Sequence, residues 1–217
     1  MTTALARRIT AEFLGTLFLL AAVVGSGIMG DRLSSGNVAI ALLANSIATG
    51  AALTALILAF GPISGAHFNP VVTFADAWQG ETVWRDVPPY IAAQIAGAIA
   101  GVAIAHLMFG ETLFRAATHA RSGSAQLLSE FIATFGLLAV IWGCSRPRPS
   151  GVPYAVGAYI AAAYWFTSST SFANPAVTLA RAMTNTFAGI RPSDVPGFIL
   201  SQIAGAFAAS LLFRWLH

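Results

Sequence analysis

Charged residues are scarce in this 217-residue chain, at 9% of the total, whereas soluble globular proteins carry about 25%. Lysine is absent, so all eleven cationic side chains are arginines, and they are scattered along the chain. This dispersed set lacks the clustered basic stripe of a nucleic-acid-binding protein. Hydrophobic residues make up 57% of the chain, and the mean hydropathy is +0.74. These values exclude a soluble globular protein and predict an integral protein of the lipid bilayer.

Cysteine is also nearly absent. Cys144 is the single cysteine, which excludes an intramolecular disulfide framework, and we interpret it as a small packed residue. No paired carboxylates, histidine cluster or Ser-His pair stands at a catalytic spacing in the sequence. We therefore expect neither an enzyme nor a bound metal or other cofactor.

Uncharged stretches divide the chain into segments of membrane length. A bilayer core of about 30 Å needs about 20 helical residues, so these stretches predict six helical membrane spans and an all-α fold. Two of the stretches, the second and the fifth, are too long for one crossing. The stretches, of which the fourth contains only the charge of Glu130, are Phe13–Gly30, Leu33–Ala75, Val87–Gly110, Ser122–Ser145, Pro149–Ala180 and Val195–Phe213.

The chain contains an internal duplication of residues 1–110 in residues 111–217. Each half has three spans, an odd number, so the second half must be inverted relative to the first. Inverted repeats place the working site near the middle of the membrane, between the repeats. The matching segments are AEFLGTLFLL from Ala11 and SEFIATFGLL from Ser129, SGAHFNPVVTFADA from Ser64 and STSFANPAVTLARA from Ser169, and QIAGA from Gln94 and from Gln202.

An Asn-Pro pair interrupts each overlong stretch, at Asn69-Pro70 and Asn174-Pro175. Asn suits a helix cap and Pro the first helical position, so each pair predicts the start of a helix of about ten residues, or about 15 Å. In inverted repeats the two helix starts would meet at the bilayer centre, with Asn69 facing Asn174. The positive ends of the helix dipoles repel cations, and the Asn amides can donate hydrogen bonds to a passing oxygen.

The segments that precede the two pairs are too polar or too glycine-rich for helix exposed to lipid, so we expect them to line a watery cavity. Their backbone carbonyls would supply hydrogen-bond acceptors along its wall. This combination predicts a path for small uncharged hydroxylated solutes. The residues predicted to line it with backbone groups are Gly65, Ala66, His67, Phe68, Phe172 and Ala173.

Over almost its whole length the chain resembles the aquaporin, or major intrinsic protein, family. The resemblance rests on AEFLGT and SEFIAT, on the paired signature SGAHFNPVVT and SFANPAVT, and on the two QIAGA segments. It implies six transmembrane helices plus two re-entrant half-helices, and a homotetramer in the bacterial inner membrane with cytoplasmic termini and one pore per subunit. The implied constriction consists of Asn69, Pro70, Val71, Asn174, Pro175 and Ala176, with Val71 where the family has alanine.

Two carboxylates, Glu12 and Glu130, lie within predicted spans. An intramembrane carboxylate can act as a proton relay. The family instead implies a structural role, in which they accept hydrogen bonds from backbone N–H groups of the irregular loops. His67 could gate the inner pore mouth with pH, although the family implies a pore-lining structural residue.

Counting from the motifs places the family's outer selectivity filter at Thr49, Ala162, Ser171 and Val177, with Ala163 as the alternative to Ala162. In the family an arginine stands at the position of Val177. The implied ring has no large or charged side chain, so the pore should be wide. It resembles that of bacterial aquaglyceroporins linked to arsenic handling, which implies passage of polyols and of metalloid hydroxides such as arsenous acid.

Loss of the filter arginine predicts a weaker barrier to cations. Arg181 offers an alternative cation, because it lies on the same helical face as Asn174, two turns further along, and could enter the outer vestibule. A more ordinary interpretation places Arg181 at the C-terminus of its half-helix, where the dipole favours it.

Two other functions share parts of this pattern. A water-selective aquaporin would carry the same paired motifs. A secondary transporter can also have inverted repeats and broken helices, but it usually needs an ionisable coupling group at the midplane. The sequence places only the neutral Asn69 and Asn174 there.

Overall fold

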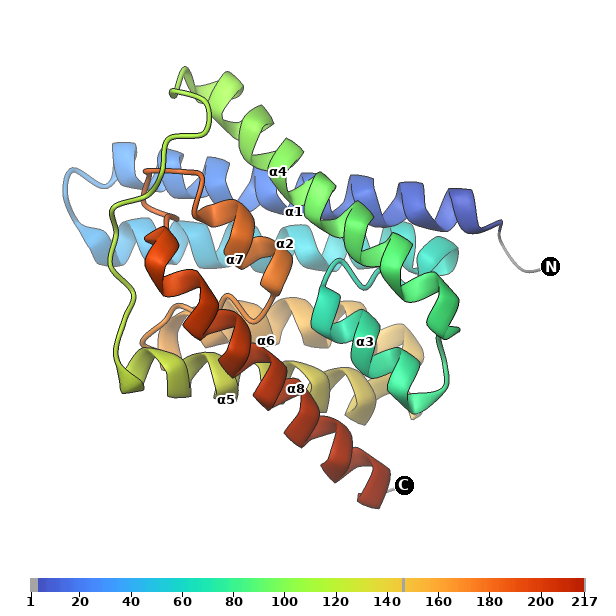
Figure 1. Ribbon diagram of the computed structural model, residues 1–217. Helices are drawn as coiled ribbons and strands as arrows, with labels where there is room; N and C mark the ends of the chain where they lie inside the picture. Colours follow the sequence, from blue (N-terminus) through green and yellow to red (C-terminus); the bar gives the residue numbers. More distant parts are fainter. Residues whose placement is uncertain (1–3, 146, 217) are drawn as a thin grey trace.

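The computed structural model describes residues 4–145 and 147–216, and within them every regular element is a helix (Figure 1). The long α-helices are α1 (Leu5–Leu33), α2 (Val38–Ser64), α4 (Val87–Phe109), α5 (Ser124–Ser145), α6 (Val152–Phe166) and α8 (Val195–Leu216). The short α-helices are α3 (Pro70–Gln79) and α7 (Pro175–Arg181). Single 3-10 turns precede three of the long helices, at Trp84–Asp86, Pro149–Gly151 and Pro192–Asp194. The predicted all-α fold class is confirmed.

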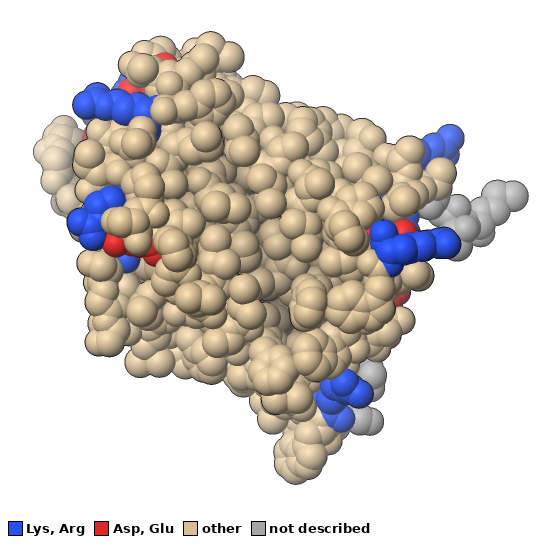
Figure 2. All heavy atoms as spheres, viewed as in Figure 1, with Lys and Arg blue, Asp and Glu red and all other residues tan. Residues whose placement is uncertain are grey.

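Among the described residues, five helices are long and apolar enough to cross a membrane: α1, α2, α4, α5 and α8. The sixth predicted span corresponds to α6, which has 15 residues, fewer than the about 20 that a full crossing needs. It ends early because the backbone becomes extended at Thr167, where the chain turns into the loop that leads to α7. Charged side chains gather at two opposite ends of the molecule, separated by a broad uncharged band (Figure 2).

Both ends of the chain lie on the same side of the molecule, which we call the terminal face, and we call the opposite side the distal face (Figure 1). The half-helix α3 lies in the terminal half of the molecule, and α7 lies in the distal half. The two half-helices therefore approach the centre from opposite sides.

Each half-helix begins at its Asn-Pro pair, as predicted. The side-chain oxygen of Asn69 accepts a hydrogen bond from the N–H of Val71, and that of Asn174 accepts from the N–H groups of Ala176 and Val177. These bonds satisfy N–H groups that have no partner within the helix at its first turn.

The two half-helices differ in length. α3 has the predicted ten residues, but α7 has only seven. α7 stops at Arg181, whose carbonyl accepts a hydrogen bond from the N–H of Ile190, far along the following loop. This contact folds residues 182–190 back onto the end of the helix.

The loops before the half-helices adopt the same strained conformation. Ala66 and Phe68 have φ angles of 51° and 49°, and Ser171 and Ala173 have 48° and 49°. Left-handed backbone costs of order 1–3 kcal/mol at a residue with a side chain. Surrounding contacts must therefore hold these loops in place.

Helix pairs pack closely at glycines. A Cβ atom on Gly97 of α4 would lie 2.3 Å from the carbonyl oxygen of Phe13 in α1, and one on Gly205 of α8 would lie 2.4 Å from that of Phe131 in α5. Only glycine permits backbones to approach this closely. The same kind of contact thus joins α1 to α4 and α5 to α8.

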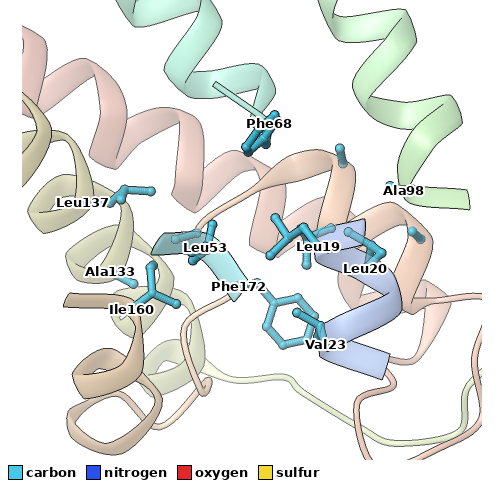
Figure 3. Packing of buried hydrophobic residues seen from close by; sticks show 14 of the residues in the cluster. Leu19, Leu20, Val23, Leu53, Phe68, Ala98, Ala133, Leu137, Ile160 and Phe172 are labelled. Atoms are coloured by element: carbon cyan, nitrogen blue, oxygen red, sulfur yellow. The ribbon is translucent and has the colours of Figure 1, made fainter. Parts of the chain in front are cut away.

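The buried apolar core draws on distant parts of the chain (Figure 3). Leu19, Leu20 and Val23 of α1 lie beside Phe172, from the loop before α7. The core fixes this loop against the longest helix of the protein.

Candidate pore and selectivity filter

A cavity of about 540 Å³ lies between the helices. Arg8, Asp76 and Glu81 line it towards the terminal face, and Arg181 lines it in the distal half. Asn69 and Asn174 line it between these ends. The remaining lining is mostly apolar side chains of the long helices and residues of the two strained loops.

Every residue predicted to line the path with backbone groups contributes to this cavity: Gly65, Ala66, His67, Phe68, Phe172 and Ala173. Four members of the predicted constriction do not line the cavity. Pro70, Val71, Pro175 and Ala176 are buried in the first turns of the half-helices, where they position the asparagines.

The two asparagines hold the loops together at the centre. The Asn69 amide nitrogen donates to the carbonyl of Ala173 at 2.7 Å, and the Asn174 amide nitrogen donates to the carbonyl of Phe68, also at 2.7 Å. An amide nitrogen carries two hydrogens. Each asparagine thus uses one N–H to join the halves and keeps a second for a solute in the cavity.

Glu12 anchors the first strained loop from α1. Its carboxylate accepts from the backbone N–H groups of His67 and Phe68, at 3.0 and 2.7 Å, from the Ser64 hydroxyl and from the Gln94 amide. With four donors, this fully buried carboxylate is satisfied within the protein.

Glu130 anchors the second loop from α5 in the same way. It accepts from the backbone N–H groups of Phe172 and Ala173, both at 2.9 Å, from the Ser169 hydroxyl and from the Gln202 amide. Both carboxylates therefore make the loop contacts predicted for a structural role.

Three of the four residues predicted for the outer filter line the cavity: Thr49, Ser171 and Val177. The prediction for Ala162 is wrong, because this residue is exposed on the outer face of α6 and does not line the cavity. Ala163 is buried but does not line it either.

Tyr164 of α6 lines the cavity and contacts Thr49, whereas Ala162 does neither. Val156, Ile160 and Tyr164 line the cavity at intervals of four residues, which is one face of a helix, and Ala162 lies about 200° round from Tyr164. α6 is apolar on nearly every side, so its sequence pattern alone does not identify the face towards the cavity.

Arg181 lies along the cavity with 2% of its surface exposed. Its Nε donates to the carbonyl of Ala188, and its guanidinium carbon lies 3.4 Å from the centre of the Phe172 ring. This stacking on an aromatic face is a cation–π contact. The side chain therefore turns back along the half-helix into the distal part of the pore.

Sequence reasoning missed Arg121, which precedes α5. It is 7% exposed and binds the carbonyls of Gly189 and Ser169 at 2.9 and 3.0 Å. Burial lowers the pKa of the Arg121 guanidinium to about 10. These carbonyls and the Thr170 hydroxyl, to which Arg121 also donates, are brought together only by the fold, so no sequence pattern marks the contact.

Comparison with known proteins places the chain in a family. The family model for the major intrinsic protein matches residues 1–171. The chain is 56% identical over 212 residues to the aquaglyceroporin AqpS of Rhizobium meliloti (strain 1021), covering 98% of this chain and 91% of that protein. It is 36% identical over 216 residues to aquaporin NIP1-3 of Oryza sativa subsp. japonica, covering 95% of this chain and 74% of that protein.

The chain belongs to the major intrinsic protein family. Its fold matches the X-ray structure of the aquaglyceroporin from Plasmodium falciparum with a TM-score of 0.76 at 19% identity, over 97% of this chain and 96% of that one. As a multi-pass membrane protein of this family, it is a passive channel for small solutes and not an enzyme.

The mouth of the channel at the terminal face is polar. His67 lines it, with Nδ1 3.1 Å from the Thr73 hydroxyl and Nε2 3.6 Å from the Asp76 carboxylate. Asp76 also accepts from the hydroxyl of Thr82. These contacts hold the imidazole against α3.

Proposed function

We propose that this channel is of the aquaglyceroporin type and passes small uncharged polyols and metalloid hydroxides such as arsenous acid, with or without water. The observation that carries the proposal is Val177, an aliphatic side chain that lines the cavity three residues after Asn174. An arginine there would place five N–H donors and a fixed charge in the path. Valine leaves that space to the solute.

The proposed filter consists of Thr49, Tyr164, Ser171 and Val177. Three hydroxyl groups can exchange hydrogen bonds with a polyhydroxylated solute, while valine contacts its apolar surface. Ser171 lines the cavity, and its buried hydroxyl has no hydrogen-bond partner among the described residues. The 56% identity to a protein named an aquaglyceroporin supports the same solute class.

A water-selective aquaporin is the second candidate. The observation that favours it is Tyr164, because a large aromatic ring at the filter reduces the aperture. Tyr164 is bound to Thr49 at 3.2 Å, so its ring is held in one position. Solute permeation decides between the two candidates.

We also propose that residues 1–110 and 111–217 form two inverted repeats around this path. The matching anchors Glu12 and Glu130 support it, as do the matching backbone angles of the two loops. In this arrangement Asn69, Pro70, Val71, Asn174, Pro175 and Ala176 form the central constriction.

The proposed location is the bacterial inner membrane, with the terminal face cytoplasmic and four copies forming a homotetramer. Both chain ends lie on one face, as a shared cytoplasmic location of the two termini requires. Protease digestion of a C-terminal tag in inside-out vesicles tests it: a protected tag would place the termini outside. Light scattering of the purified protein in detergent gives the number of subunits.

Stopped-flow light scattering of proteoliposomes tests the solute class. Water, glycerol and urea are compared, together with uptake of arsenous acid, for the native protein and for Val177→Arg. We expect the native channel to pass all the larger solutes and Val177→Arg to lose them while it retains water. Val83→Arg is the matched control, since Val83 is 57% exposed outside the cavity. A native protein that passes only water is the water-selective channel.

A further inference from the structure

Arg181 is a buried cation without an acidic partner. Its Nε donates to the carbonyl of Ala188, but within residues 4–145 and 147–216 its two terminal nitrogens make no hydrogen bond and no carboxylate forms an ion pair with it. Burying an unpaired charge costs several kcal/mol. A protein keeps such a residue inside a membrane when the solute path uses it.

The position of Arg181 is one helical turn beyond Val177. Residues four apart lie on the same face of a helix, about 6 Å apart along its axis. Both residues line the cavity, and α7 points towards the distal face. A solute that enters from that side therefore meets Arg181 before it reaches Val177.

Phe172 fixes the guanidinium in this place. The ring lies 3.4 Å from the Arg181 guanidinium carbon and 5.0 Å from that of Arg121, and the loop that carries it is anchored by Glu130. The ring also packs in the core beside Val23 of α1 (Figure 3). The cation is thus held by a rigid support, which a selectivity residue requires.

The pKa of a nearby histidine also depends on these positive charges. His119 lies in the loop before α5, and its pKa is lowered by partial burial and then by the charges of Arg121 and Arg181. The guanidinium carbons of Arg121 and Arg181 lie 5.0 and 3.4 Å from the centre of the same Phe172 ring, so two positive charges lie together in the distal half of the molecule. An electropositive mouth of low dielectric constant lowers the local concentration of cations.

We propose that Arg181 excludes cations from this channel, in place of an arginine at position 177. The charge then belongs to a residue that is not part of the ring of Thr49, Tyr164, Ser171 and Val177, so aperture and charge are set by different residues. The barrier to cations is therefore retained, contrary to the expectation from Val177 alone. The proposal rests on the proposed function in one respect: the path from which cations are excluded is the path that neutral solutes take.

Cation conductance in planar bilayers tests the proposal, with solute flux into proteoliposomes measured on the same preparations. Arg181→Gln removes the charge and the Nε hydrogen bond. Arg181→Lys keeps the charge but also loses that bond, because lysine lacks the guanidinium Nε–H group of arginine. Arg115→Gln is the matched control, since Arg115 is an exposed arginine of the loop on the distal side.

We expect background cation conductance for the native protein, Arg181→Lys and Arg115→Gln. Arg181→Gln should conduct at least about tenfold more, equivalent to about 1.4 kcal/mol of barrier. The double variant Val177→Arg/Arg181→Gln should return to background, since it restores a cation one turn further in.

Three results would overturn the proposal: conductance of the native protein above that of protein-free bilayers, equal conductance of Arg181→Gln and Arg115→Gln, or equal leak in Arg181→Gln and Arg181→Lys. The last result would mean that Arg181 acts through its hydrogen bond to the Ala188 carbonyl and not through its charge. If Arg181→Gln fails to fold, a native conductance above that of protein-free bilayers would still overturn the proposal. A native protein that excludes cations but passes no glycerol would contradict the proposed solute class and leave the role of Arg181 supported.

Discussion

The hydroxyl oxygens of Thr49 and Tyr164 lie 3.2 Å apart inside the cavity, and their hydrogen bond joins α2 to α6. Both side chains are almost fully buried, at 2% and 3% exposed. Because each hydroxyl is the other's partner, the bond holds the aromatic ring at the filter. We therefore expect the size of residue 164, and not that of residue 162, to limit the aperture.

Tyr164→Ala should widen the filter. Removing the ring and its bond to Thr49 is expected to raise glycerol and arsenous acid flux several-fold, with a smaller change for water, which already fits. Ala162→Val is the matched control, because Ala162 is exposed on the outer face of α6, and it should leave all fluxes unchanged. Stopped-flow assays on equal amounts of reconstituted protein give both answers. If Ala162→Val changed solute flux and Tyr164→Ala did not, residue 162 and not residue 164 would belong to the filter.

Glu12→Gln should destabilise the first strained loop. A hydrogen bond to a charged group contributes about 1.5–3 kcal/mol, and glutamine would turn N–H groups towards the donors that now bind the carboxylate. A loss of about 3 kcal/mol corresponds to a fall of roughly 6–12 °C in unfolding temperature for a chain of this size.

The control for this change is Glu111→Gln. Glu111 forms an exposed ion pair with Arg32 at 2.8 Å, and such pairs contribute about 1 kcal/mol or less. Size-exclusion chromatography after heating, followed by intrinsic fluorescence, measures both variants. Equal unfolding temperatures for the two would mean that Glu12 does not anchor the loop.

Gly50→Ala should separate α2 from α6 and disturb the filter. The added Cβ would lie 2.7 Å from the carbonyl oxygen of Gly157, and overpacking of this kind costs about 1–3 kcal/mol. Thr49 is the adjacent residue, so its contact with Tyr164 should be lost and solute flux should change. Gly143→Ala is the control, as no atom lies within 4 Å of its added Cβ. If both variants keep native flux and stability, the helices can shift without moving the filter.

Much of the fold could be predicted from the sequence because its signals are local. Uncharged stretches marked the spans, and the Asn-Pro pairs marked the starts of α3 and α7. The lengths of α6 and α7 could not be predicted in this way. α6 ends where the chain turns back at Thr167, and α7 ends where Arg181 and Ile190 bond through their backbones.

The candidate site was predicted where a residue is fixed by its own motif. Asn69, Asn174, Ser171 and Val177 stand within or beside the pairs, and counting placed them correctly in the cavity. The count to Ala162 crossed a loop of unknown length and named a residue that is exposed and does not line the cavity. No count could find Arg121, which reaches the carbonyl of Ser169 across 48 positions of the chain.

The pKa of His119 should report the charge of Arg181. Its pKa is lowered because partial burial and the charges of Arg121 and Arg181 all disfavour the imidazolium form. In Arg181→Gln one positive charge is lost, so the pKa should rise towards its ordinary value of about 6.5. NMR titration of histidine-labelled protein, with His119→Gln to assign the signal, measures the midpoint.

The lowered pKa of His119 also makes the stability of the folded protein depend on pH. A histidine with a lowered pKa binds fewer protons in the folded than in the unfolded protein, so its contribution is fully present above about pH 6.5 and is lost as the pH falls through the folded pKa. Arg181→Gln should narrow that acid-sensitive window, whereas Arg115→Gln should leave it nearly unchanged, because Arg181 and not Arg115 is among the charges that lower the pKa of His119. An unchanged midpoint in Arg181→Gln would mean that the Arg181 charge does not reach the distal vestibule.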